Sequence, residues 1–142
     1  MPEARSEAAS EPCVFCAIVR RESPAWIVFE DTASVAFLDL FPYTRGHLLV
    51  VPKRHVDRLV ELRSGEHGEY LRSVAEACRR VERLAHDYNV AMNQGRLAGQ
   101  IIFHLHFHII PRYNEGNPFQ VHGRERIAEP DARELLTVLG PS

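Results

Sequence analysis

The chain has 142 residues, of which 45% are hydrophobic, which is enough for one globular domain with a sizeable core. Its formal net charge of −2 excludes a strong general attraction to nucleic acid or to an anionic membrane surface. No apolar run approaches the roughly 20 residues that a membrane-spanning helix needs. We expect residues 1–11, which are rich in Ala, Glu and Ser and lack the apolar core of a signal peptide, to form a disordered tail. A single domain over residues 12–142 and a cytoplasmic location are the corresponding expectations.

The first third of the chain predicts one short helix and three strands. Aromatic and β-branched residues are concentrated in the first two predicted strands, as is typical of sheet surfaces. The third predicted strand is almost continuously apolar, which favours a position at the buried centre of a sheet. The helix is expected at residues 15–20 and the strands at residues 26–30, 34–38 and 47–52.

A long helix is the clearest periodic element. Ser64 is its expected N-cap, and Glu66 lies near the positive end of the helix dipole. Cys78 falls on the apolar face and is interpreted as a small core residue. The apolar residues at helical spacing are Leu71, Val74, Ala75, Cys78, Val81, Leu84, Ala85 and Tyr88.

The second half of the chain predicts two more strands, at residues 90–93 and 101–111, and a terminal helix at residues 131–139. Hairpin-like turns between the early strands favour antiparallel pairing. The order of the elements indicates the α+β class, with a sheet of about five antiparallel strands and the helices on one side of it.

Three histidines, His104, His106 and His108, alternate with apolar residues in the last predicted strand. Successive side chains of a strand point to opposite faces, so the three imidazoles are expected to share one face. An imidazole can act as a base, a nucleophile, a donor to phosphate or a metal ligand. The alternatives are a solvated histidine-rich face and a cluster that only binds metal. The opposite, core-facing side of the strand would hold Ile101, Phe103, Leu105, Phe107 and Ile109.

The run from His104 to Ile110, His-Leu-His-Phe-His-Ile-Ile, resembles the signature of the histidine triad (HIT) superfamily. The resemblance extends in order from about Cys13 to Arg112. It implies a HIT-like fold and a nucleotide hydrolase of the bacterial, Hint-like type. The other matching segments are residues 37–42, 46–53, 55–56, 93–95, 98–100 and 111–112.

The resemblance implies a reaction through a covalent nucleotidyl-histidine intermediate. His106 would be the nucleophile, with its second ring nitrogen donating to a backbone carbonyl of the strand. His108 would contact the phosphate and donate a proton to the leaving group. His47 aligns with a family histidine close to the triad, where it would belong to a proton relay.

The resemblance also implies the nucleotide-binding residues. Asp39 would accept hydrogen bonds from the ribose hydroxyls. Asn93 would donate to a phosphate or leaving-group atom, although a turn-closing role fits its position equally well. An apolar slot for the base would be lined by Phe15, Ile18, Phe37 and Leu40, for which ordinary core packing is the alternative.

Backbone N–H groups of Gly99 and Gln100 are expected to bind the α-phosphate, because donors aimed at developing charge stabilise a transition state. The chain departs from the family pattern at Ile101. The best-known family members carry Ser or Thr there, whose hydroxyl contacts phosphate, so one donor is lost or replaced. The identity of the leaving group therefore stays open.

Cys13 and Cys16 have the Cys-x-x-Cys spacing of a metal knuckle, which supplies half of a tetrahedral site. His55 and His104 are the candidates for the other half. The resemblance to bacterial-type HIT proteins implies that the four hold a structural zinc ion. A redox dithiol, plain core cysteines, and a metal-free His104 bonded within the triad are the alternatives.

The leading functional hypothesis is a purine nucleoside phosphoramidase or related nucleotide hydrolase. A dinucleoside polyphosphate hydrolase differs from it only in the leaving group. A nucleotide-binding scaffold protein with little turnover is the third hypothesis. The resemblance implies a homodimer, and no basic stripe indicates a nucleic-acid partner.

Overall fold

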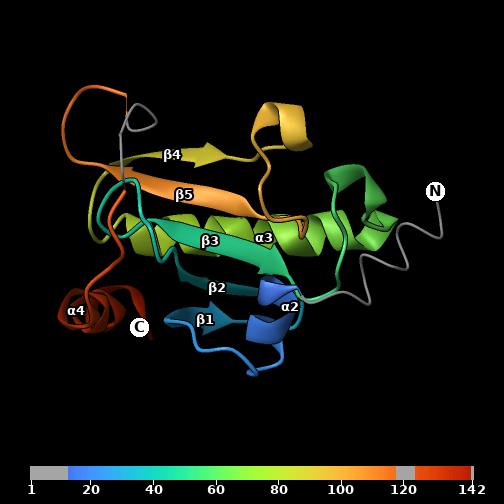
Figure 1. The fold of residues 1–142 in the computed structure, drawn as a ribbon, viewed down its shortest axis with the longest axis horizontal. Coiled ribbons are helices and arrows are strands. Elements are labelled where there is room, and N and C mark those ends of the chain that lie inside the picture. The colour runs from blue at the N-terminus through green and yellow to red at the C-terminus, as the bar shows by residue number, and fades with distance from the viewer. Residues whose placement is uncertain (1–12, 118–123, 142) are drawn as a thin grey trace.

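The computed structural model describes residues 13–117 and 124–141, so the expected tail at residues 1–11 lies outside the described residues. Five antiparallel strands form one sheet in the order β1-β2-β3-β5-β4 (Figure 1). The α+β class with about five antiparallel strands is confirmed. The strands are β1 Ile27–Glu30, β2 Ser34–Leu38, β3 Leu48–Pro52, β4 Asp87–Ala91 and β5 Phe107–Arg112. The helices are α2 Val14–Val19, η1 Leu59–Glu61, α3 Ser64–Val81, η2 Arg96–Ala98 and α4 Glu129–Leu139.

The sheet is buried on both faces, because the side chains of β2 and β3 alternate between two hydrophobic clusters. Ala36 and Val50 pack with α3 and α4, whereas Phe37 and Leu49 pack with α2. Figure 1 shows α3 behind the sheet and α2 in front of it. The expectation that all helices lie on one side is therefore wrong. Phe15 and Ile18 give α2 an apolar stripe of its own, and this stripe is buried on the opposite face.

The buried stripe of α3 differs from the predicted one. It runs through Tyr70, Val74, Ala77 and Val81, while Leu71 is 62% exposed. The Tyr70 hydroxyl donates to the carbonyl oxygen of Val50 over 2.8 Å, which orients this stripe toward β3. Burial of a side chain of this size contributes about 1.5–3 kcal/mol.

Other predicted members of the stripe fall elsewhere. The helix ends at Val81, so Leu84 and Ala85 follow it and Tyr88 belongs to β4. Ser64 is the first helical residue rather than the N-cap, and Glu66 accepts a hydrogen bond from the Arg63 N–H. Cys78 is half-buried and packs against the larger core cluster, in agreement with its interpretation as a core residue.

The last predicted strand is shorter than expected. Pairing with β3 begins at Phe107, opposite Val50, and the N–H of Leu105 instead donates to the Val56 carbonyl. His104 therefore lies in the segment that leads into β5. Ile101 and Phe103 are 81% and 44% exposed, so their predicted place in the core is wrong. Leu105 and Ile109 are buried, as predicted.

The neighbouring elements are also shifted. β4 ends at Ala91, which leaves Asn93 in the loop, and α4 begins at Glu129 with Pro130 in its first turn. Within residues 13–117 and 124–141, no helix combines the length and the apolar character that crossing a bilayer requires.

Candidate active site and metal centre

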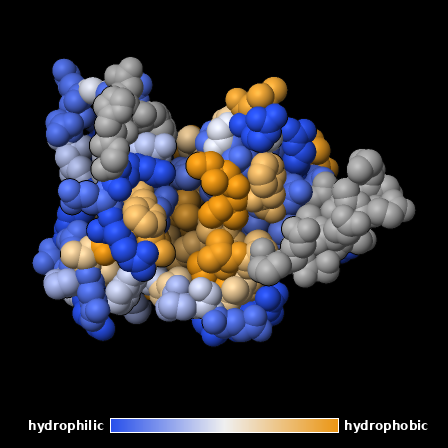
Figure 2. All heavy atoms as spheres, in the orientation of Figure 1, coloured by the Kyte–Doolittle hydropathy of each residue, from blue (hydrophilic) through white to orange (hydrophobic). Residues whose placement is uncertain are grey.

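A cavity of about 680 Å³ opens on the face of the sheet that α2 covers. Its volume lies within the range of roughly 300–1,000 Å³ that is usual for small-ligand sites. Figure 2 shows apolar side chains gathered in a hollow at the middle of this face. The lining combines an apolar group with a polar one. The apolar group includes Phe15, Ile18, Phe37 and Leu40, and the polar group includes Asp39, Asn93, His106 and His108.

His106 is held in one orientation by its own chain. Its Nδ1 lies 2.7 Å from the carbonyl oxygen of His104, and a carbonyl oxygen only accepts, so Nδ1 carries the proton. Nε2 then keeps its lone pair. Burial lowers the pKa of His106, so the ring stays neutral near pH 7. A neutral imidazole with a free Nε2 beside an open cavity has the properties of a nucleophile.

His108 and His47 form a directed hydrogen-bonded pair. The backbone N–H of Tyr43 donates to His47 Nδ1 over 3.1 Å, so the proton of a neutral His47 resides on Nε2. That Nε2 lies 2.9 Å from His108 Nδ1 and 3.5 Å from an Asp39 carboxylate oxygen. His47 therefore donates to His108, whose own proton is directed to Nε2. This arrangement gives His108 a donor for a ligand in the cavity.

Both rings of the pair are neutral. Burial, followed by the proximity of His106 and of the Arg124 charge, lowers the pKa of His108 to about 4. Burial, followed by the proximity of His108, lowers the pKa of His47 well below its usual value. Because His47 is only 1% exposed and does not line the cavity, it can act on a ligand only through neighbours that do, such as His108 and Asp39.

Asp39 and the four apolar residues of the expected base slot all line the cavity. One carboxylate oxygen of Asp39 accepts the Phe41 N–H, and burial raises the pKa of this carboxyl group. The ring of Phe15 packs edge-on against Phe37 at 5.4 Å and against His106 at 5.2 Å. The apolar slot thus borders His106 directly. Phe15, Ile18 and Phe37 also belong to the smaller hydrophobic cluster, so these three residues pack in the core and line the cavity at the same time.

The loop before His104 departs from the expected arrangement. The N–H of Gly99 donates to the Arg96 carbonyl, and the N–H of Gln100 donates to the Gly95 carbonyl. Gln100 is 3% exposed, and its side chain bonds to the backbone at Gly95, Asp57 and Ile102. Neither N–H group is free for a phosphate, and Gln100 does not line the cavity. Gln100 stabilises the loop that carries Gly99 and Ile101, both of which do line it.

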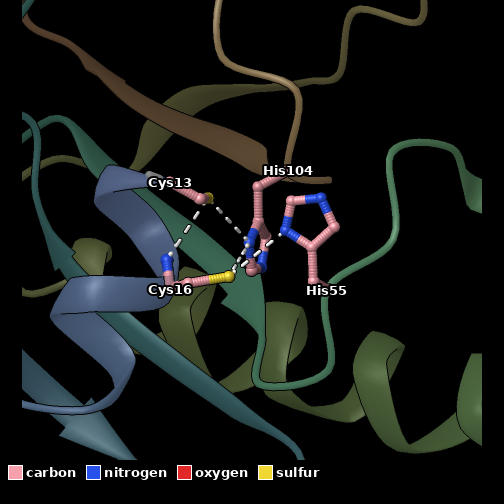
Figure 3. Close-up of side chains that lie close together, drawn as sticks. All are labelled: Cys13, Cys16, His55 and His104. Carbon is pink, nitrogen blue, oxygen red and sulfur yellow. Dashed lines mark hydrogen bonds between the residues drawn. The ribbon is translucent and has the colours of Figure 1, made fainter. Parts of the chain in front are cut away.

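Cys13, Cys16, His55 and His104 converge beside the cavity, although they come from three parts of the chain (Figure 3). Their ligand atoms all lie within 4.8 Å of one another. The Nδ1 atom of His104 is 3.6 Å from each sulfur, and that of His55 is 3.2 Å from the Cys16 sulfur. Zn–S and Zn–N bonds of about 2.3 and 2.1 Å in a tetrahedron place sulfur and nitrogen roughly 3.5 Å apart.

The outer hydrogen bonds of this cluster also suit a metal ion. His104 donates Nε2–H to the Pro52 carbonyl, and His55 directs Nε2 to Asp57, so both Nδ1 lone pairs point toward the sulfurs. Ligating histidines are usually oriented in this way. Burial and the neighbouring Cys13 raise the pKa of Cys16 to about 11, so a nearby cation is needed to stabilise its thiolate. The donor set fits zinc.

Two polar residues of the described cavity lining were not found from the sequence. Tyr43 orients His47 through its backbone, and Arg124 lines the cavity from the segment after β5. Arg124 stands among charged residues near the C-terminal end, where nothing distinguishes it in the sequence. A backbone donor such as that of Tyr43 leaves no compositional signal at all.

Comparison with known proteins finds relatives that match most of the chain. An uncharacterised HIT-like protein of Methanocaldococcus jannaschii is 45% identical over 102 residues, or 71% of this chain and 79% of the relative. The adenosine 5′-monophosphoramidase of Schizosaccharomyces pombe is 40% identical over 103 residues, covering 72% of this chain and 76% of the relative.

Solved structures share the fold. A hypothetical histidine triad nucleotide-binding protein of Sulfolobus tokodaii superposes with a TM-score of 0.80 at 32% identity, over 89% of each chain. A zinc-bound histidine triad family protein of Mycobacterium smegmatis has a TM-score of 0.73 at 34% identity, over 93% of this chain and 94% of that one. The family model for the HIT domain matches residues 20–115, which include the His104–His108 motif and most of the cavity lining. The chain belongs to the histidine triad family.

Proposed function

We propose that the protein is a nucleotide hydrolase that acts at the α-phosphate of a nucleotide, with His106 as the nucleophile. The observation that carries this proposal is the His104 carbonyl, which fixes the proton on His106 Nδ1 and leaves Nε2 as the free nitrogen beside the cavity. The phosphoramidase activity in the name of the Schizosaccharomyces pombe relative supports this reaction class.

The reaction proceeds in two displacements. In the first, His106 Nε2 forms a bond to the α-phosphorus while the bond to the leaving group breaks. In the second, water breaks the phosphorus–nitrogen bond, which releases the nucleoside monophosphate and restores the neutral imidazole. The proton lost by the water balances the one gained by the leaving group.

The other residues bind and orient the nucleotide. His108 donates from Nε2 to the phosphate or to the leaving atom, and His47 keeps its ring in the required tautomer. Asp39 accepts from the ribose hydroxyls, and Asn93 donates to a phosphate oxygen. The apolar slot beside Phe15 holds the base. With the N–H groups of Gly99 and Gln100 used within their loop, His108 and Asn93 carry the stabilisation of the phosphate charge.

Zinc completes the proposal as a structural ion held by Cys13, Cys16, His55 and His104. It would fix α2, and with it Phe15, against the segment that carries the catalytic histidines. The zinc-bound relative from Mycobacterium smegmatis supports the assignment. We also propose that the protein is a homodimer, which light scattering of the purified protein would detect, and that its location is cytoplasmic.

Replacement of His106 tests the mechanism. We expect His106→Asn to reduce turnover of adenosine 5′-phosphoramidate by at least about a thousandfold while AMP binding is retained, because the nucleophile is lost but the slot is not. His86→Asn is the matched control, since its side chain is fully exposed. Retention of substantial turnover in the His106 variant, or an equal loss in the control, would contradict the proposal.

A further inference from the structure

The segment that follows β5 returns to the cavity and places a cation in its wall. The N–H of Ile127 donates to the Leu40 carbonyl over 2.8 Å, which fixes this segment against the loop between β2 and β3. The Arg124 guanidinium lies 4.1 Å from the centre of the Tyr43 ring, in the geometry of a cation–π contact. Arg124 is partly buried and lines the cavity. Its position is therefore supported by both backbone and side-chain contacts.

Arg124 is the only arginine or lysine among the described residues that line the cavity, and Asp39 is the only carboxylate. Because a guanidinium group stays protonated in proteins, Arg124 supplies the permanent positive charge of the described lining. The nearby Arg45 is paired with Asp131 and Glu134 over 2.7 and 2.6 Å. Arg124 instead lies over the face of Tyr43, and its charge also reaches the Asp39 carboxylate, where it partly offsets the rise in pKa that burial causes.

The charge lies on the His108 side of the site. Tyr43 stacks on His47, with ring centres 5.5 Å apart, and His47 is bonded to His108. Phe15 contacts His106 from the direction of α2, which is the end proposed for the base. A displacement at phosphorus places the attacking and leaving atoms roughly in line, so the leaving group lies beyond the α-phosphate and away from His106.

We propose that Arg124 forms an anion subsite for the leaving group. Preferred substrates then carry a negatively charged phosphate or sulfate beyond the α-phosphate, rather than a neutral amine. This inference rests on the proposed function and names the substrate class within it.

The test compares two adenylyl substrates that differ in leaving-group charge, adenosine 5′-phosphosulfate and adenosine 5′-phosphoramidate. Arg124→Gln removes the charge and is expected to lower kcat/KM for the sulfate about tenfold, as for loss of one charge-assisted contact. The phosphoramidate value should change by less than about twofold, because a neutral amine makes no charge-assisted contact. Arg126→Gln is the matched control, because Arg126 lies over the Phe41 ring at 5.8 Å but does not line the cavity.

An equal loss on both substrates, or no loss on either, overturns the inference. If the unaltered protein turns over neither substrate, the proposed function fails, and equilibrium binding still tests the subsite. Arg124→Gln should then weaken ADP binding about tenfold and AMP binding little, because only ADP carries an anion at the leaving-group position. Equal changes for ADP and AMP contradict the subsite. A selective loss for adenosine 3′,5′-bisphosphate contradicts it as well, because it assigns Arg124 to the ribose.

Discussion

Removal of one cysteine from the four-residue cluster is expected to abolish the stabilisation of the fold by zinc. The separations of 3.6, 3.6 and 3.2 Å between sulfur and nitrogen need little adjustment to become the edges of a zinc tetrahedron. Zinc should therefore bind the folded state with little rearrangement. An ion that binds only the folded state stabilises it by about 2.7 kcal/mol at one hundred times its dissociation constant.

The expected shift in melting temperature follows from the size of the domain. At about 4 °C per kcal/mol, 2.7 kcal/mol raises the Tm by roughly 10 °C. In Cys16→Ala one strong ligand is missing. If the affinity falls about a thousandfold, the same zinc concentration raises the Tm by less than about 1 °C.

Thermal unfolding of chelator-treated protein, with and without added zinc, is the assay. Cys78→Ala is the matched control, because Cys78 lies on α3 and is not part of the cluster. It should respond to zinc as the unaltered protein does. The reasoning is refuted if zinc does not raise the Tm of the unaltered protein, or if Cys16→Ala responds as strongly.

Two further predictions concern stability. The pKa values of His47 and His108 are lower in the folded chain than in the unfolded one. Between about pH 6.5 and 4 the unfolded chain therefore binds more protons than the folded one. The free energy of unfolding should fall as the pH falls through this window. Urea unfolding at several pH values checks this, and His108→Gln should show a weaker dependence; a flat profile for the unaltered protein would contradict it. Gly46→Ala should destabilise the fold by about 1–3 kcal/mol, because Gly46 has a φ of +91° and a Cβ there would overlap Leu84. The corresponding loss of Tm should be absent in Gly65→Ala, where a Cβ meets nothing within 4 Å.

Most element types could be predicted, because hydrophobic periodicity is a local property. The strand over residues 34–38 was predicted with the bounds that the structure has, and that over residues 47–52 within one residue. Burial of single side chains and the ends of elements were predicted less well, because tertiary contacts decide them. Leu71 fits a helical apolar pattern as well as Tyr70 does, but the bond from Tyr70 to Val50 orients the stripe. The exposed Ile101 was assigned to the core because an alternating pattern does not show where a strand begins to pair.

Residue types and local spacings were sufficient to predict a chemistry for the site. The alternation of His104, His106 and His108 indicated histidine catalysis, and the spacing of Cys13 and Cys16 indicated half of a metal site. The family resemblance then assigned His106 as the nucleophile and added His55 to the metal ligands. Each of these inferences rests on residue types and spacings that are read locally.

The contacts between these groups, in contrast, depend on the fold. His104 reaches the cysteines across 91 and 88 positions of sequence, because β5 pairs beside β3 while α2 covers the same face. The tautomer of His47 depends on a backbone N–H, which every residue type except proline can supply, and that of His106 on a backbone carbonyl, which every residue type can supply. The place of Arg124 in the cavity depends on one hydrogen bond and one ring contact to a loop about 80 residues earlier. Such contacts carry no periodic signal, since they arise only when the sheet brings distant segments side by side.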